Sequence, residues 1–264
     1  MTLQDEHKKT ILIKNFSTSK HLIIYTDNCV LIIYINGVSI VYNCGEFVSI
    51  ERGVNFSFKM IKNNMNQPPC KILRLDYKEL ILLKTMFISC YPSKLKDTML
   101  KRTNEDKIIK EQNNLEIRRL FEFIDKNKDP FIHVVVIAYM ITKFSKMEKI
   151  INSLYISAAT TFTDKVKCII NDDLSKKWRL SMIADQFHIT EIAVRKRLAQ
   201  EHTSFNNLLL ELRMNTAMQM LHEDGDKIHQ ISKKIGISST SYFIKHFKNY
   251  FGITPKQYLI YFRS

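Results

Sequence analysis

One short pattern occurs twice near the C-terminal end of this sequence, and it constrains the fold more than any other feature. Each copy has a short helix with one apolar face, a tight turn, and a second helix with basic residues on its outward face. Ile183 and Ile231 match in the first helices, 48 residues apart, and Val194 and Phe243 match in the second helices, 49 residues apart. This order is typical of the helix-turn-helix, whose second helix enters the DNA major groove.

The residues at the two turns support the same interpretation. His188 stands where the first copy needs a left-handed backbone, a conformation that Gly accepts freely and that His accepts more often than bulkier residues do. Gly236 stands at the matching place in the second copy, and Thr190 can cap the second helix of the first copy. We therefore predict helix-turn-helix units at about 180–201 and about 227–250.

The outward positions of the two second helices are the predicted contacts with double-stranded DNA. Lys196 and Lys245 occupy matching places, as do Ile192 and Ser241. Two interpretations of Ile192 stay open, contact with a thymine methyl group or packing within the protein. The chain has no Asp or Glu after Asp226, so the second copy is strongly basic. The predicted DNA-binding residues are Ile192, Arg195, Lys196, Thr240, Ser241, Lys245 and Lys248.

A single helix over about 204–223 is predicted between the two copies. At about 1.5 Å per residue it spans roughly 27 to 30 Å, close to one turn of DNA at roughly 34 Å. Such a rod can hold two recognition helices over successive major grooves, so that one chain reads two half-sites. Thr254, Pro255 and Gln257 then provide the capping residues of a final short helix.

The first half of the chain has the residue pattern of strands. From Ile11 to about Tyr77, short β-branched and aromatic runs alternate with turn residues. Asn36-Gly37 between two such runs predicts a hairpin, because both residues readily take the positive φ angles of a type I′ turn. We expect a small antiparallel, cupin-like barrel over about 10–90.

The helical spacing begins at about residue 104 and continues to about 162. Phe131–Ile141 is predicted to be a buried helix, because it is the longest apolar stretch and falls short of the roughly 20 residues of a membrane span. The predicted fold class is α+β, with an N-terminal domain for ligand sensing or dimerisation at 1–162 and an all-α DNA-binding domain at 163–264.

Charge and composition narrow the function classes. The net charge of +14 favours approach to a polyanion, although charge alone does not separate nucleic acid from anionic lipid. The five cysteines include no C-x-x-C pair, and the sequence contains no phosphate loop, nucleophile elbow or H-x-H metal pattern. We therefore predict no enzyme activity, no cofactor and no metal. The charged N-terminus is unlike a signal peptide, so we expect a cytoplasmic protein that does not enter membranes.

At this point a family resemblance becomes specific. The second copy and the residues after it resemble the signature of the AraC/XylS regulators, and Asp164-Lys165-Val166 and Glu51-Arg52-Gly53 add likeness to the enteric virulence activators of the ToxT, Rns and RegA kind. The resemblance implies a transcription activator of virulence genes that works with RNA polymerase. The signature residues are Ile228, Ile231, Ser232, Gly236, Ser241, Tyr242, Phe243, Lys245, Phe247, Lys248, Gly252, Thr254 and Pro255.

An arginine in the strand-rich half suggests a ligand. Strand alternation places Arg74 on the same face as Cys70 and Ile72, and an inward arginine requires an anion. One interpretation is an ion pair with Asp76 or Glu51. The other is a pocket for a small carboxylate, assisted by Lys20 or His21, and the family resemblance implies a fatty acid or bicarbonate as the effector. The predicted ligand-binding residues are Lys20, His21 and Arg74.

Two functions therefore stay open from the sequence. One is an activator whose DNA binding responds to an anion in the N-terminal domain. The other is a regulator whose N-terminal domain serves only as a homodimer interface or partner contact.

Overall fold

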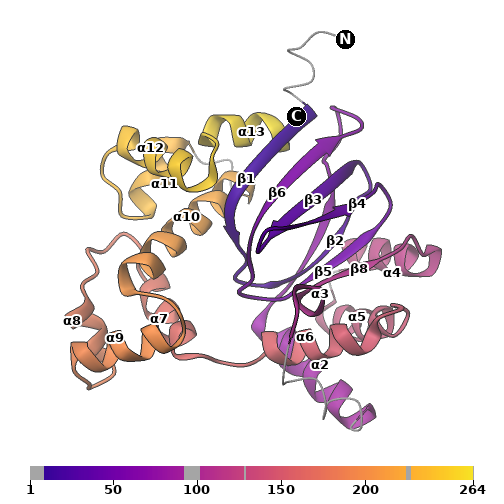
Figure 1. The fold of residues 1–264 in the computed structure, drawn as a ribbon, viewed down its shortest axis with the longest axis horizontal. Coiled ribbons are helices and arrows are strands. Elements are labelled where there is room, and N and C mark those ends of the chain that lie inside the picture. The colour runs from indigo at the N-terminus through magenta and orange to yellow at the C-terminus, as the bar shows by residue number, and fades with distance from the viewer. Residues whose placement is uncertain (1–8, 92–101, 128, 224–226, 264) are drawn as a thin grey trace. The chain divides into compact units, whose positions relative to one another are not determined.

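The computed structural model describes residues 9–91, 102–127, 129–223 and 227–263 (Figure 1). The chain divides into two compact units, here called the N-terminal unit (Met1–Ala159) and the C-terminal unit (Thr160–Arg263). The division falls three residues before the predicted boundary at 162 and 163.

Two four-stranded antiparallel sheets form the framework of the N-terminal unit (Figure 1). One sheet has the order β1-β6-β3-β4 and the other has the order β7-β2-β5-β8. The strands are β1 (Thr10–Ser17), β2 (His21–Tyr25), β3 (Cys29–Ile35), β4 (Val38–Tyr42), β5 (Phe47–Ile50), β6 (Asn55–Lys62), β7 (Lys71–Leu75) and β8 (Ile108–Glu111).

The predicted hairpin is confirmed. Ile35 of β3 pairs with Val38 of β4, and the two residues between them, Asn36 and Gly37, have φ angles of 49° and 77°. Both angles are positive, as a two-residue type I′ connection requires.

Helices cover one face of the second sheet (Figure 1). Ile23 and Tyr25 of β2 and Phe47 of β5 belong to one buried cluster with Ile137 of α5 and Leu154 of α6. Removing these apolar side chains from water stabilises the packing of the helices on the sheet. The helices are α2 (Tyr77–Cys90), α3 (Asn104–Lys107), α4 (Leu115–Lys126), α5 (Pro130–Thr142) and α6 (Met147–Ser157).

Three expectations for this unit are corrected. Residues 77–90 are helix α2 and not part of a barrel, because Asp76 and Glu79 form a capping box that starts a helix. Residues 108–111 form strand β8, because Ile108 and Ile109 complete the edge of the second sheet. Helix α5 is buried on one face only, and Phe131 on its other face is 77% exposed.

The C-terminal unit is entirely helical in its described part. Its first helix-turn-helix is α8 with α9, its second is α11 with α12, and α10 connects them (Figure 1). His188 and Gly236 occupy the two turns with φ angles of 52° and 76°, as the sequence predicts. The helices are α7 (Phe162–Asn171), α8 (Leu180–Gln186), α9 (Glu191–Gln200), α10 (Phe205–Glu223), α11 (Ile228–Lys234), α12 (Thr240–Phe251) and α13 (Pro255–Arg263).

Candidate DNA-binding surface

Packing of the first helix-turn-helix determines which side of α9 faces outward. Thr190 caps the helix by accepting a hydrogen bond from the backbone N–H of Ala193 at 3.2 Å. Val194 and Leu198 are fully buried in a cluster that also contains Leu208 of α10. The opposite side of α9 is therefore exposed.

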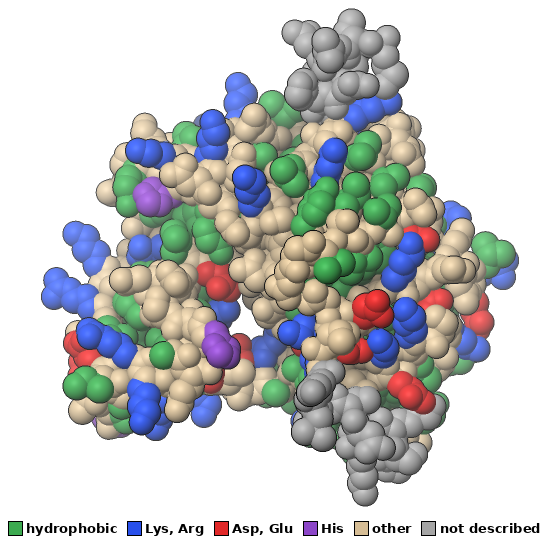
Figure 2. Space-filling model, in the orientation of Figure 1, with side chains coloured by type: hydrophobic (Ala, Val, Ile, Leu, Met, Phe, Trp, Pro, Cys, Tyr) green, Lys and Arg blue, Asp and Glu red, His purple; other side chains and the backbone are tan. Residues whose placement is uncertain are grey.

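The three predicted contacts of α9 lie on this exposed side. Ile192 is 77% exposed, so it does not fill a gap in the packing of this unit. Lys196 is exposed, and Arg195 forms an exposed pair with Glu191 at 3.2 Å, one helical turn earlier. An exposed pair of this kind contributes little to stability and is easily exchanged for a phosphate contact. Figure 2 shows Lys and Arg side chains projecting from the surface around α8 and α9.

Helix α12 is oriented in the same way by aromatic residues. Phe243, Phe247 and Phe251 are fully buried, and their successive ring centroids lie 5.7 and 4.7 Å apart. Ser239 caps the helix by accepting from the N–H of Tyr242 at 3.3 Å. The aromatic residues are therefore core, and they direct the other side of α12 to the surface.

Three of the four predicted contacts of α12 are exposed, namely Ser241, Lys245 and Lys248. Thr240 is half-buried, and its Oγ1 lies 3.5 Å from Oγ of Ser232 on α11, so it faces the neighbouring helix. Tyr242 is not among the predicted contacts, yet it is 55% exposed beside Ser241, and its ring centroid lies 4.0 Å from that of His246. In the sequence, only its position next to the outward residue Ser241 indicates this exposure.

Helix α10 is long enough to separate two recognition helices by about one DNA turn. Its 19 residues span about 28 Å at about 1.5 Å per residue. Its first half contributes Leu208 and Leu212 to the core of the first helix-turn-helix. The helix also contacts α11 and α13. One helix therefore belongs to both helix-turn-helix units.

The predicted anion site in the N-terminal unit is not assembled as expected. His21 is fully buried, and its two ring nitrogens lie 2.8 Å from Ser49 Oγ and 3.0 Å from Ser157 Oγ. Burial lowers the pKa of His21 to about 3, so the ring is neutral and offers no positive charge to an anion. His21 joins β2 and β5 to α6.

Arg74 is exposed, so the expectation of an inward arginine is wrong. In the antiparallel register Leu22 lies opposite Arg74 and His21 lies opposite Leu75. Because neighbouring residues of a strand point to opposite faces, Arg74 and His21 do not converge on one ligand. Lys20 precedes β2 and is half-buried.

The proposed partners of Arg74 are engaged elsewhere. Glu51 accepts hydrogen bonds from both terminal nitrogens of Arg102, at 2.8 and 2.5 Å. The side chain of Asp76 accepts from the N–H of Glu79 at 2.9 Å, as the cap of α2. The predicted ion pairs of Arg74 with these residues are therefore wrong.

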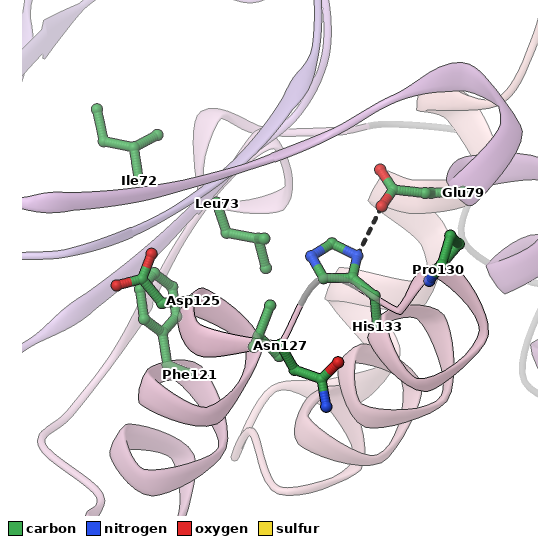
Figure 3. Close-up of a pocket in the computed structure, with 9 residues that line it drawn as sticks. Ile72, Leu73, Glu79, Phe121, Asp125, Asn127, Pro130 and His133 are labelled. Atoms are coloured by element: carbon green, nitrogen blue, oxygen red, sulfur yellow. Dashed lines mark ion pairs between the residues drawn. The ribbon is translucent and has the colours of Figure 1, made fainter.

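A cavity of about 430 Å³ lies between β7, α4 and the start of α5 (Figure 3). Leu73 and Phe121 give it an apolar wall, and two other lining residues form an ion pair, with His133 Nδ1 2.7 Å from Glu79 Oε1. The other carboxylate oxygen of Glu79 accepts from the N–H of Asp76 at 2.7 Å. This acidic group therefore joins the starts of α2 and α5.

Among the residues that the structure describes, no helix is long and apolar enough to cross a membrane. The same residues include no group of three or more His, Cys, Asp or Glu side chains placed to hold a metal ion.

Comparison with known proteins relates both units to transcription regulators. A family described as a helix-turn-helix domain matches residues 183–260. The DNA-binding dual transcriptional regulator Rns of Escherichia coli is 40% identical over 260 residues, which are 98% of this chain and 97% of Rns. The virulence regulon transcriptional activator VirF of Shigella flexneri is 30% identical over 258 residues, covering 98% of each chain.

Solved structures of ToxT from Vibrio cholerae show the same fold. One, at 16% identity, covers 97% of this chain and 95% of ToxT with a TM-score of 0.74. Another, with unsaturated fatty acid bound, has 17% identity and a TM-score of 0.67 and covers 96% of this chain and 91% of ToxT.

Proposed function

This chain belongs to the AraC/XylS family of DNA-binding transcription regulators, and we propose that it is a cytoplasmic activator of virulence genes. It binds the promoters of these genes with α9 and α12. The observation that carries the proposal is the pair of recognition helices, each with a buried apolar side and an exposed basic side, joined by α10. Its relatives include a virulence regulon transcriptional activator, which supports the biological role.

The exposed side chains of α9 and α12 are suited to different parts of the DNA. Lys248 and Arg195 are suited to phosphates, which supply affinity and make it depend on salt. Lys196 and Lys245, at matching places, are suited to guanine edges in the major groove, and Ile192 is suited to a thymine methyl group. An asymmetric operator is expected, because Ile192 and Ser241 occupy matching places and have different chemistry.

The experiment that tests this function is transcription in vitro from promoters selected by the purified chain out of its own genome. We expect the chain to increase transcripts by RNA polymerase from those promoters, and to do so only when the selected DNA site is present. Selected sites that bind the chain while transcription is unchanged or reduced at all of them would contradict the role of activator and leave DNA binding intact.

We further propose that a small carboxylate, either a fatty acid or bicarbonate, modulates this activity. The support is a structural neighbour, ToxT, solved with unsaturated fatty acid bound, together with the exposed position of Arg74 in this chain. The Arg74 guanidinium lies on edge strand β7, where its planar fork is accessible to a carboxylate. The buried, neutral His21 takes no part in this proposal.

A homodimer is the second candidate role of the N-terminal unit. Phe131, Val135 and Tyr139 are exposed at four-residue intervals and form one apolar strip along α5. Asp129 stands at one end of this helix and Lys146 follows the other. We infer that a second copy covers the strip in the antiparallel direction, because a two-fold axis then places each acidic end against a basic end.

Sedimentation of the full chain tests the dimer. We expect a dimer that Val135→Asp converts to a monomer, because the substitution places a charge in the centre of the strip. Leu82→Asp, at an exposed apolar position on α2, is the matched control and should leave the dimer intact. A chain that is monomeric at micromolar concentration, or a dimer that Val135→Asp leaves unchanged, would contradict this interface.

A further inference from the structure

The turn of the second helix-turn-helix is in direct contact with the loop that precedes the first. Gly236 has a φ angle of 76°, and a Cβ atom at this position would lie 2.6 Å from the carbonyl oxygen of Leu174 and 2.9 Å from that of Ser175. Real Cβ atoms essentially never lie closer than about 3.0 Å to another heavy atom, and both of these oxygens belong to the backbone. Only glycine therefore lets these two segments meet, for reasons of both space and backbone conformation.

One side chain from the middle of α10 completes this contact. Nη2 of Arg213 donates to the carbonyl oxygens of Leu174, at 3.4 Å, and Lys176, at 3.1 Å. The same nitrogen would lie 2.8 Å from a Cβ of Gly236, so the guanidinium sits against the second turn as well. The side chain is half-buried, and this burial lowers the pKa of Arg213.

The loop that receives Arg213 is itself held in place. Asp173 accepts from the N–H of Ser175 at 2.9 Å through its side chain and from Trp178 Nε1 at 2.8 Å through its carbonyl oxygen. Leu174 belongs to the buried cluster of the first helix-turn-helix, together with Ile183 and Val194. The loop thus moves with the first unit of the repeat, while Gly236 belongs to the second.

We propose that Arg213, Gly236 and the carbonyl groups of Leu174 and Lys176 form a lock between the two helix-turn-helix units, which fixes the separation and relative rotation of α9 and α12. Arg213 is a positioning residue, because it acts through the two recognition helices and need not touch DNA. The lock makes the spacing between half-sites a part of DNA specificity, a consequence that rests on the proposed function. Without it, bending of α10 near its middle would let each recognition helix find its own groove.

A first experiment needs no DNA. Amide hydrogen exchange is measured on the full chain, on Arg213→Ala, and on the control Lys167→Ala, which breaks the 3.0 Å pair between α7 and Glu211 of the same helix α10. We expect Arg213→Ala to accelerate exchange in both 172–179 and 232–239, segments of different units, and Lys167→Ala to leave 232–239 unchanged. Unchanged exchange in 232–239 in Arg213→Ala would overturn the lock whatever the protein binds.

A second experiment measures the effect on specificity. The affinity of each protein is compared on an operator selected by the unsubstituted chain and on the same operator with two base pairs inserted between the half-sites. We expect the insertion to cost the unsubstituted chain and Lys167→Ala about tenfold or more, because the second groove is rotated away. For Arg213→Ala, the insertion should lower the affinity by about threefold or less. On the original operator, this variant should lose less affinity than the insertion costs the unsubstituted chain.

Arg213→Lys keeps the charge and loses the planar fork, so it should show an intermediate spacing penalty. An equal penalty in all four proteins would overturn the lock. If the unsubstituted chain selects no operator, the proposed function fails, and the exchange measurement alone decides the lock. A general loss of stability would weaken binding to both operators equally and would leave their ratio unchanged.

Discussion

Burial of Val194 and Leu198 on α9, and of Phe243 and Phe247 on α12, decides which side chains of the recognition helices face outward. The sequence predicted this correctly because helical spacing alone places these residues on one side. Thr240 differs because its neighbour across the turn, Ser232, is close enough to draw its hydroxyl inward, and sequence spacing does not reveal such a contact.

Lys196→Ala and Lys245→Ala test the outward residues. If these lysines contact bases, each substitution should weaken binding to a selected promoter by roughly 1 to 3 kcal/mol, and by less if they contact only phosphates. The measurement is a binding titration at several salt concentrations. Lys14→Ala, at an exposed position on β1, is the control for lost charge. Normal binding by both folded variants would contradict the assigned orientation of the two helices on DNA.

Arg74→Ala tests the proposed effector site. Because Arg74 is exposed, we expect the variant to fold normally and to bind promoter DNA as before, while losing the response to a fatty acid or bicarbonate. The response is the change in promoter affinity when the carboxylate is added, and Lys14→Ala should retain it. A full response in Arg74→Ala would show that the effector acts elsewhere.

For helices, strands and turns, residues close together in the sequence predicted the structure better than expectations that depend on how distant strands pair. The hairpin at Asn36-Gly37 and both helix-turn-helix units follow from residues close together in sequence. The orientation of Arg74 depends on the register of β7 against β2, about fifty residues away, which sequence alternation does not define. The start of helix α2 does have a local signal in the sequence, the capping box of Asp76 and Glu79. The residues before it have the pattern of a strand, and the predicted barrel was extended through them to about residue 90.

His21 links β2, β5 and α6, and its lowered pKa predicts how stability depends on pH. In the unfolded chain this side chain takes a proton near pH 6.5, whereas in the folded chain it does so only near pH 3. The unfolded state therefore binds more protons between these values, and the free energy of unfolding should fall by up to about 1.4 kcal/mol for each pH unit from about 6 down to about 3.

Chemical unfolding between pH 7 and pH 4 measures this slope. His21→Gln keeps a polar side chain beside Ser49 and Ser157 and removes the titrating group, so its slope should be smaller. His202→Gln, at an exposed position, is the control and should keep the original slope. Equal slopes in all three proteins would mean that His21 can be protonated in the folded state.

At the scale of the whole molecule, the C-terminal unit contains both helix-turn-helix units and their connecting helix, so we expect it to fold and bind DNA alone. The first residues of this unit hold its first helix in place. Thr161 caps α7 in a reciprocal pair with Asp164, and Glu201 accepts from the N–H groups of Phe162 and Thr163 at 2.8 Å each. A domain that began at the predicted residue 163 would lack Thr161 and Phe162.

A fragment of residues 160–264 should therefore be more stable than one of residues 164–264, by about 1 kcal/mol or more, because the shorter fragment lacks the cap. Both should bind promoter DNA with an affinity that falls steeply as salt rises. Urea unfolding and binding titrations on the two fragments measure these differences. Equal stability would contradict the role of the cap, and a folded 160–264 fragment without DNA binding at low salt would contradict the autonomy of the unit.

We propose that one chain places α9 and α12 in two successive major grooves of DNA. Methylation interference on a selected promoter tests it most directly, because it reports guanines contacted in the major groove. We expect two clusters of contacts about 10 base pairs apart on one face of the duplex, with Lys196→Ala weakening one cluster and Lys245→Ala weakening the other. A single cluster, or one that both substitutions affect equally, would contradict it.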